Sequence, residues 1–190
     1  ITDMRRHLVL SEGKPPKQAS ESLEATMQDG NPWGYPKSDR LKWAVDAGLE
    51  LPTLAEKKEV DVLYWVGCAG AYDPRNQNIA QSVVKILKAA RVDFAVLGKE
   101  ESCSGDSARR LGEEYLFETL VQRNITTLGK YKFNTVITAC PHCFHTLSNE
   151  YPDFGGNYNV VHHSEFIQQL LDEGRLNPEK TLAKKVTYHD

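Results

Sequence analysis

The residues of this chain whose type and spacing are best suited to chemistry are its four cysteines, Cys68, Cys103, Cys140 and Cys143. Each follows a segment that reads as a buried strand, and the last two form a Cys-x-x-Cys motif. The first three are separated by about the length of one strand–helix unit. Thiolates are soft ligands that suit zinc and iron–sulfur clusters. The pattern therefore predicts a thiolate-ligated metal or cluster site.

Parallel strands explain how cysteines so far apart in the sequence would meet. In an open parallel α/β sheet, the loops after the carboxyl ends of the strands gather along one edge. The Cys-x-x-Cys motif opens a predicted helix, whose N-terminus stabilises thiolate charge, and Pro141 fits the first turn of that helix. One buried cysteine is most simply a packing residue. Four of them at strand ends favour a shared site.

Regular alternation of strands and helices begins near residue 60 and indicates the fold class. Asp73 and Pro74 are typical N-cap and N1 residues, and further helices are predicted over 106–128 and 164–171. Consecutive βα units favour right-handed crossovers and a parallel sheet. We therefore expect an α/β fold, a mostly parallel sheet with helices on both faces, as in Rossmann-like βα repeats. The predicted strands cover residues 60–67, 94–97, 135–139 and 159–161.

Residues 1–59 read as a helical and irregular arm that lies outside this alternation. Proline and glycine interrupt a mostly polar stretch, so only short helices are predicted in it. The expected features are helices over 19–27 and 38–47, the second capped by Ser38 with Val45 on its apolar face, and the packing of Trp33 and Trp43 against the core.

Charge and hydropathy exclude several classes of function. The 190 residues have a net charge of -3 and a pI near 6.1, so nucleic acid is not an expected partner. The longest apolar stretches, such as 62–66, are far shorter than the roughly 20 residues of a membrane-spanning helix, and residues 1–13 lack a signal-peptide pattern. The cysteine usage favours a reducing compartment. We expect a cytoplasmic location.

Three short motifs, Gly67-Cys68, Cys103-Ser104-Gly105 and Cys140-Pro-His-Cys143, together resemble a known domain family. It is the cysteine-rich CCG domain of heterodisulfide reductases and related iron–sulfur oxidoreductases. The resemblance covers residues 60–190 and is closest to membrane-linked Fe–S oxidoreductases associated with electron-transfer flavoprotein. In those proteins a cytochrome-b-like membrane domain and a ferredoxin-like domain precede two CCG repeats.

The resemblance implies a division of the chain into three parts. Residues 60–185 correspond to the first CCG repeat, and residues 1–59 to a linker arm that follows a missing ferredoxin-like domain. Residues 186–190 correspond to the start of a truncated second repeat. The sequence over 185–190 also reads as the opening of a strand, so we expect a fragment of a longer protein.

The family pattern also implies the ligands and the function. Cys68, Cys103, Cys140 and Cys143 correspond to cluster ligands, whereas Ser104 stands where the family has a second, adjacent cysteine. Four thiolates favour an ordinary [4Fe–4S] cluster, with the Ser104 hydroxyl as an occasional ligand or, more simply, a hydrogen-bond donor to sulfide. Zinc is the alternative or adventitious metal. The implied function is electron transfer between a flavoprotein donor and a quinone pool, with membrane association through absent domains; the fragment alone is expected to be inactive.

Other polar residues are predicted near the same edge of the sheet. His162 and His163 follow the fourth predicted strand and are candidates for a metal ligand or a proton carrier, although helix capping or surface exposure is the simpler explanation. His142 is expected to point outward. Arg109 and Arg110 are predicted near the start of the helix after Cys103, where cations oppose the helix dipole. That position indicates either an anionic neighbour or a solvated pair.

Two other classes of function stay open at this point. Cys140-Pro-His-Cys143 is also the redox dithiol of some thioredoxin-like proteins, but such folds place it after an early strand and leave Cys68 and Cys103 without a role. Four thiolates would equally satisfy a structural zinc ion in an interaction domain without enzymatic activity. Analysis of iron, sulfide and zinc separates the three classes.

Overall fold

A computed structural model describes residues 1–15, 17–180 and 183–187 of the chain. Within these residues the sheet has four parallel strands in the order β2-β1-β3-β4. The central strand β1 is buried along its whole length, and Leu63 pairs with Ala95 on one side and Val136 on the other. The predicted α/β fold with a parallel sheet is therefore confirmed. The strands are β1 (Val62–Trp65), β2 (Phe94–Ala95), β3 (Thr135–Thr138) and β4 (Val160–His162).

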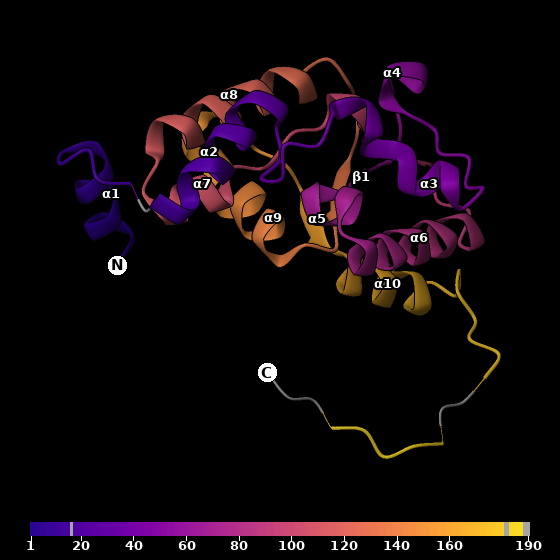
Figure 1. The fold of residues 1–190 in the computed structure, drawn as a ribbon. Coiled ribbons are helices and arrows are strands. Elements are labelled where there is room, and N and C mark those ends of the chain that lie inside the picture. The colour runs from indigo at the N-terminus through magenta and orange to yellow at the C-terminus, as the bar shows by residue number, and fades with distance from the viewer. Residues whose placement is uncertain (16, 181–182, 188–190) are drawn as a thin grey trace.

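Helices cover both faces of the sheet (Figure 1). Tyr64 of β1 belongs to a core cluster with α6 (Pro74–Ala89) and α3 (Lys42–Asp46), and Phe166 of α10 (His163–Asp172) packs against the same cluster. Trp65, the next residue, belongs to a second cluster built largely on α8 (Glu114–Leu128). Because successive side chains of a strand point to opposite faces, one short apolar strand supplies both cores.

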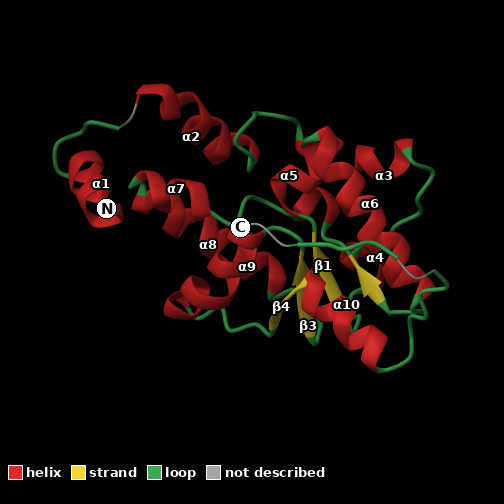
Figure 2. Cartoon of the chain, turned by 90° about the horizontal axis from the view of Figure 1, so that it is seen from below, coloured by secondary structure: helices red, strands yellow, loops and turns green. Residues whose placement is uncertain are grey.

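Short helices follow the carboxyl ends of the strands, on the side where Figure 2 shows α5, α7 and α9. Asp73 caps α6, as predicted, by accepting a 2.9 Å hydrogen bond from the amide of Asn76. Other helical elements include α2 (Lys17–Asp29), α4 (Leu54–Lys57), α5 (Gly67–Tyr72), η2 (Gly98–Glu100), α7 (Asp106–Leu111), α9 (Pro141–His145), η3 (Thr146–Glu150) and η4 (Tyr151–Phe154).

The long helix predicted over 106–128 is wrong, because Gly112 divides it into α7 and α8. Gly112 has φ +93°, a left-handed conformation that ends a helix. Its missing side chain also makes room for α1 (Thr2–Leu10), since a Cβ atom there would lie 2.5 Å from the carbonyl carbon of Arg5. The break therefore allows α1 to pack closely against Gly112. Helical periodicity in the sequence does not reveal this contact.

The arm contains the predicted helices, but their boundaries and the packing of their side chains differ from the prediction. Residues 38–47 form a 3₁₀ turn, η1 (Lys37–Leu41), followed by α3, and the N-cap is Pro36 rather than Ser38. Trp43 is buried as expected, but Trp33 is about half exposed (51%) and Val45 is exposed. The turn around Trp33 is held instead by Asn31, whose side-chain oxygen accepts hydrogen bonds from the amides of Trp33 and Tyr35.

The strand predicted over 185–190 is not found in its described part. Residues 185–187 are exposed and unpaired with any described strand, while 188–190 lie outside the described residues. A strand needs a neighbour for its backbone hydrogen bonds, and the described sheet ends at β2 and β4. No helix within the described ranges is both long and apolar enough to cross a bilayer.

Candidate metal centre

The four cysteines lie at the carboxyl edge of the sheet, each in a different local setting. Cys68 is in α5 directly after β1, Cys103 lies between η2 and α7, Cys140 is the N-cap of α9, and Cys143 is inside that helix. All are free thiols; Cys140 is half-buried and the other three are buried. The local reason is that β1 and β3 end in tight turns into helices at this edge.

The thiols form two hydrogen-bonded pairs that interact with each other. The thiol of Cys68 lowers the pKa of Cys103 to about 7, and that of Cys143 lowers the pKa of Cys140 to about 6. In each pair the other thiol has a raised pKa, chiefly through the same hydrogen bond, so the pair shares a proton. Cys103 and Cys68 also contribute electrostatically to the raised pKa of Cys143. The four sulfurs therefore share one electrostatic environment.

Glycines bring the backbone close to the sulfurs. Gly67 has φ +77°, and a Cβ atom on it would lie 3.5 Å from the sulfur of Cys143. The backbone just after β1 therefore lies close to the Cys-x-x-Cys motif at Gly67. At Cys103, the sulfur accepts a hydrogen bond from the amide of Gly105 at 3.4 Å, and the Ser107 hydroxyl also bonds to it. These donors favour thiolate at Cys103.

Ser104 is buried, and its backbone helps to hold the loop of Cys103. The Ser104 carbonyl accepts a 3.0 Å hydrogen bond from the hydroxyl of Tyr151. Asn124 donates to that hydroxyl and to the carbonyl of Cys103, both at 2.9 Å. Ser107, which no sequence motif indicated, supplies the hydroxyl beside the Cys103 sulfur. The ligand or donor role predicted for the Ser104 side chain stays a prediction.

A buried ion pair lies against the thiols and was also missed from the sequence. Arg40, from η1, donates a 2.8 Å hydrogen bond to Glu101, and both side chains are only 1% exposed. The same Arg40 nitrogen, Nη2, lies 3.6 Å from the sulfur of Cys68. Glu101 also accepts the amides of Val66 and Gly67. Only Glu101 carried a signal in the sequence, its position two residues before Cys103; Arg40 lies in a polar arm among ordinary charged residues.

The histidines lie near the carboxyl end of β4 without a described bond to a cysteine. Nδ1 of His162 is 2.7 Å from the hydroxyl of Ser164, and its ring contacts His163 and Phe144. Burial, followed by the charge of His162, lowers the pKa of His163. His142 is exposed, as expected, and faces Asp106 at 3.0 Å. The roles predicted for His162 and His163 in ligation or proton transfer stay predictions.

Arg109 and Arg110 lie in the last turn of α7 rather than near the start of a long helix. This corrects their predicted position, and the reason is the break at Gly112. Both pair with Glu150, and Arg110 also pairs with Asp106. Their anionic neighbours are thus carboxylates of the chain itself.

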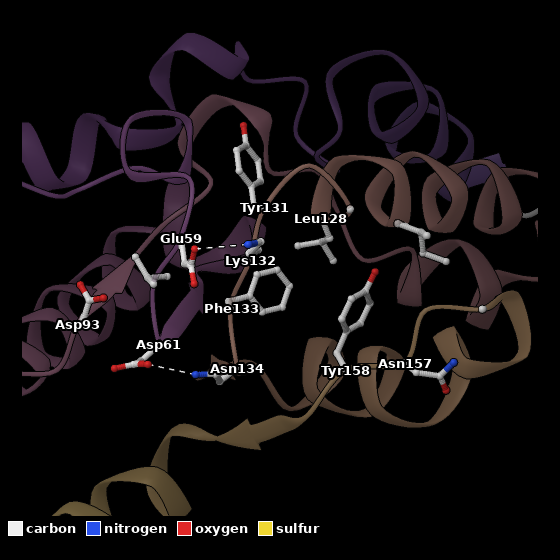
Figure 3. A pocket seen from close by; sticks show the side chains of 14 residues that line it. Glu59, Asp61, Asp93, Leu128, Tyr131, Lys132, Phe133, Asn134, Asn157 and Tyr158 are labelled. Atoms are coloured by element: carbon white, nitrogen blue, oxygen red, sulfur yellow. Dashed lines mark hydrogen bonds and ion pairs between the residues drawn. The ribbon is translucent and has the colours of Figure 1, made fainter.

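Two cavities differ in their relation to the thiols. A cavity of about 210 Å³ is lined by Cys140, Pro141, His142 and mostly apolar residues of β1, α5 and α6. A larger one, about 760 Å³, lies at the opposite, amino-terminal edge of the sheet (Figure 3). Its polar side chains include two pairs, Glu59 with Lys132 and Asp61 with Asn134. We therefore assign the chemistry to the thiol edge.

The residues at this edge fit an anionic group bound through thiolates. Four free sulfur donors share the edge with a fully buried guanidinium, and two nitrogens of Arg40, Nε and Nη1, are buried without a hydrogen bond of normal geometry in the described structure. Buried unpaired donors are costly. Among the described residues, no three His, Cys, Asp or Glu side chains are arranged around the position of one metal ion.

Comparison with known proteins identifies the class of domain that this fold and site define. Residues 62–148 match the family described as the cysteine-rich domain, CCG, and all four cysteines lie in that segment. Residues 62–148 therefore form a cysteine-rich domain of the CCG family. No solved structure matches it significantly.

Three curated relatives illustrate this membership. The chain is 47% identical to a "Probable membrane-anchored ferredoxin" of Chromohalobacter salexigens and 42% identical to an "EtfAB:quinone oxidoreductase" of Syntrophomonas wolfei, in both cases over 100% of this chain. It is 30% identical, over 84% of its length, to one polypeptide of a "Dihydromethanophenazine:CoB--CoM heterodisulfide reductase" of Methanosarcina mazei. It spans only 29%, 27% and 39% of these relatives, respectively.

Proposed function

We propose that the four thiols hold an iron–sulfur cluster and that the chain is an electron-transfer module of an iron–sulfur oxidoreductase. The observation that carries this proposal is the position of four free thiols at one edge of the sheet, those of Cys68, Cys103, Cys140 and Cys143. Relatives whose names include ferredoxin and quinone oxidoreductase support it. When bound, the cluster supplies one-electron redox chemistry; the protein residues supply its ligands and surroundings.

We propose a [4Fe–4S] cluster. Such a cluster takes four cysteine thiolates, one for each iron, so the sulfurs need not converge on a single atom. A structural zinc ion would instead need four ligands at about 2.0–2.3 Å from one centre. Ser104, in place of a fifth cysteine, fits the four-thiolate cluster. Zinc is then the metal expected in protein prepared in air.

We further propose a flavoprotein donor and a quinone pool as the redox partners. The relative named EtfAB:quinone oxidoreductase supports both. Residues 60–185 would be the first of two CCG repeats, after a ferredoxin-like domain, in a longer protein. The relative named membrane-anchored ferredoxin supports association with a membrane. We propose that this occurs on the cytoplasmic side, through domains outside this chain.

A second candidate function is thiol–disulfide exchange at Cys140. Its lowered pKa, about 6, and partial exposure are properties of a reactive thiol. This function would leave the other pair, Cys68 and Cys103, without a role. We therefore rank it below electron transfer.

Anaerobic purification of the 190-residue chain, with quantitation of iron, acid-labile sulfide and zinc, tests the proposal. We expect about four iron and four sulfide per chain, broad visible absorption, and loss of both on exposure to air. One zinc per chain without sulfide would indicate the structural site. A metal-free chain with a Cys140–Cys143 disulfide would indicate the exchange reaction. Either result contradicts the proposed electron transfer.

A further inference from the structure

We propose that Arg40 is a positioning residue of the metal centre, which donates hydrogen bonds to its sulfur atoms and raises its reduction potential. This inference rests on the proposed function. It makes the segment of the arm from Gly30 to Arg40 part of the site, although the family match covers only residues 62–148.

The position of Arg40 is the first observation. Its guanidinium is buried and packs against the ring of Tyr72. The ring centroid lies 5.7 Å from the guanidinium carbon. Nη2 is 3.6 Å from the sulfur of Cys68, at the edge where the other three thiols lie. A cation fully removed from water interacts strongly with nearby negative charge.

The hydrogen-bond inventory of Arg40 is the second observation. A guanidinium has five N–H donors, and those on Nη2 are directed to Glu101 and Cys68. Nε and Nη1 are buried without a hydrogen bond of normal geometry among the described residues, and the Tyr72 hydroxyl is an acceptor near the guanidinium. Glu101 does not require them, because one oxygen accepts the amide of Val66 and the other accepts Gly67 and Arg40. An anion bound by the thiols would supply the missing acceptors.

The anchoring of the arm is the third observation. The carbonyl of Gly30 accepts a hydrogen bond from the Cys103 amide at 2.7 Å and lies 3.6 Å from the sulfur of Cys68. The arm therefore contacts two of the four thiol-bearing residues at Gly30 and one of them again at Arg40. Two separated contacts with the same cysteines are unlike a linker that passes over the surface.

A direction of effect follows from charge. Reduction adds an electron, so the reduced cluster is more negative and gains more from a nearby cation and from donors to its sulfurs. Hydrogen bonds to sulfur and net charge are known determinants of cluster potential. Arg40 should therefore stabilise the reduced state, and its removal should shift the potential to more negative values.

The test compares the anaerobically reconstituted wild type with three variants, Arg40→Met, Arg40→Lys and the double variant Arg40→Met/Glu101→Gln. The double variant avoids an uncompensated buried carboxylate, which would itself destabilise the fold, but it loses one of the two amide bonds of Glu101, because glutamine has a single acceptor oxygen. Arg175→Met is the matched control. Arg175 bonds to the carbonyls of Ala90 and Arg91 at the end of α6, away from the thiols.

We expect Arg40→Met to shift the reduction equilibrium at least tenfold toward the oxidised cluster, about 59 mV for one electron. Arg40→Lys keeps the charge and should recover part of the shift, and Arg175→Met should leave the potential unchanged. The double variant has the formal charge of the wild type. It should remain more negative in potential than the wild type, because the donors to sulfur are missing.

A second readout does not require the cluster. In metal-free protein, Arg40→Met should accelerate amide hydrogen exchange at Cys103 and Gly67, whose partners are Gly30 and Glu101, while Arg175→Met should not. An unchanged potential in Arg40→Met, or a wild-type potential in the double variant, would overturn the role of Arg40 while leaving the cluster intact. A wild type without iron and sulfide would instead refute the proposed function, and with it this inference.

Discussion

The amide of Cys103 donates a 2.7 Å hydrogen bond to the carbonyl of Gly30. This bond joins a thiol-bearing loop at the sheet edge to an arm that precedes the first strand. Gly30 has φ +69°, and a Cβ atom on it would collide with the side chain of Ser102, so no larger residue fits without movement. The contact explains how a polar, irregular segment becomes part of the site.

Gly30→Ala should destabilise the fold at this contact. A Cβ atom would lie 2.4 Å from the Ser102 hydroxyl oxygen, in addition to the left-handed backbone. Gly48→Ala is the control, because Gly48 has φ +65° with open space around it. Backbone strain alone costs about 1–2 kcal/mol. In urea unfolding, we expect Gly30→Ala to lower the free energy of unfolding more than Gly48→Ala does. Equal losses would show that Ser102 moves aside at no energetic cost.

Gly112→Ala should release α1 from α7. The added Cβ would lie within 2.5–2.7 Å of backbone atoms of Arg5 and Arg6, and backbone cannot yield as a side chain does. Limited proteolysis should then cleave within residues 2–10 faster than in the wild type. Gly155→Ala, at φ +85° in open space, should leave that rate unchanged. Protection of α1 in Gly112→Ala would contradict the close packing of α1 against this glycine.

Substitutions around Cys103 should separate ligands from hydrogen-bond donors. Cys103→Ala removes a proposed ligand and should abolish the intact cluster. Ser104→Ala should leave iron nearly unchanged, and Ser107→Ala, which loses the hydroxyl bonded to the Cys103 sulfur, should change mainly the potential. Iron and sulfide per chain are the measurements. If Ser104→Ala loses as much iron as Cys103→Ala, Ser104 is a ligand and the four-cysteine assignment is wrong.

Alkylation of the metal-free chain should begin at Cys140. The Cys143 thiol and the amides of Cys143 and His142 lower the pKa of Cys140 to about 6, against about 8.5 for a free thiol. Because the thiolate is the nucleophile, the rate should be low at pH 5, rise through pH 6 and level off near pH 7. Peptide mapping after brief iodoacetamide treatment measures this. A rate that keeps rising to pH 8.5 would exclude the hydrogen-bonded pair.

Elements with strong local signals could be predicted from the sequence. The apolar runs that contain β1 and β3 are buried strands, Asp73 caps α6, and the cysteines lie at one edge because parallel strands share a direction. Boundaries were less well predicted, since the single helix over 106–128 is broken at Gly112. Helical periodicity continues across that glycine, so the periodicity alone did not reveal the break that the left-handed conformation of Gly112 makes.

The parallel α/β fold and the gathering of the four cysteines could be read from the sequence, because hydrophobic runs, caps and the direction of parallel strands are local or topological properties. The surroundings of those cysteines could not be read from it. Arg40 meets Glu101, Gly30 meets Cys103, and Ser107 bonds to the Cys103 sulfur. These contacts join segments without a shared periodic pattern. They depend on how the arm packs over the sheet edge. That packing is determined by burial and hydrogen bonds between residues far apart in the sequence.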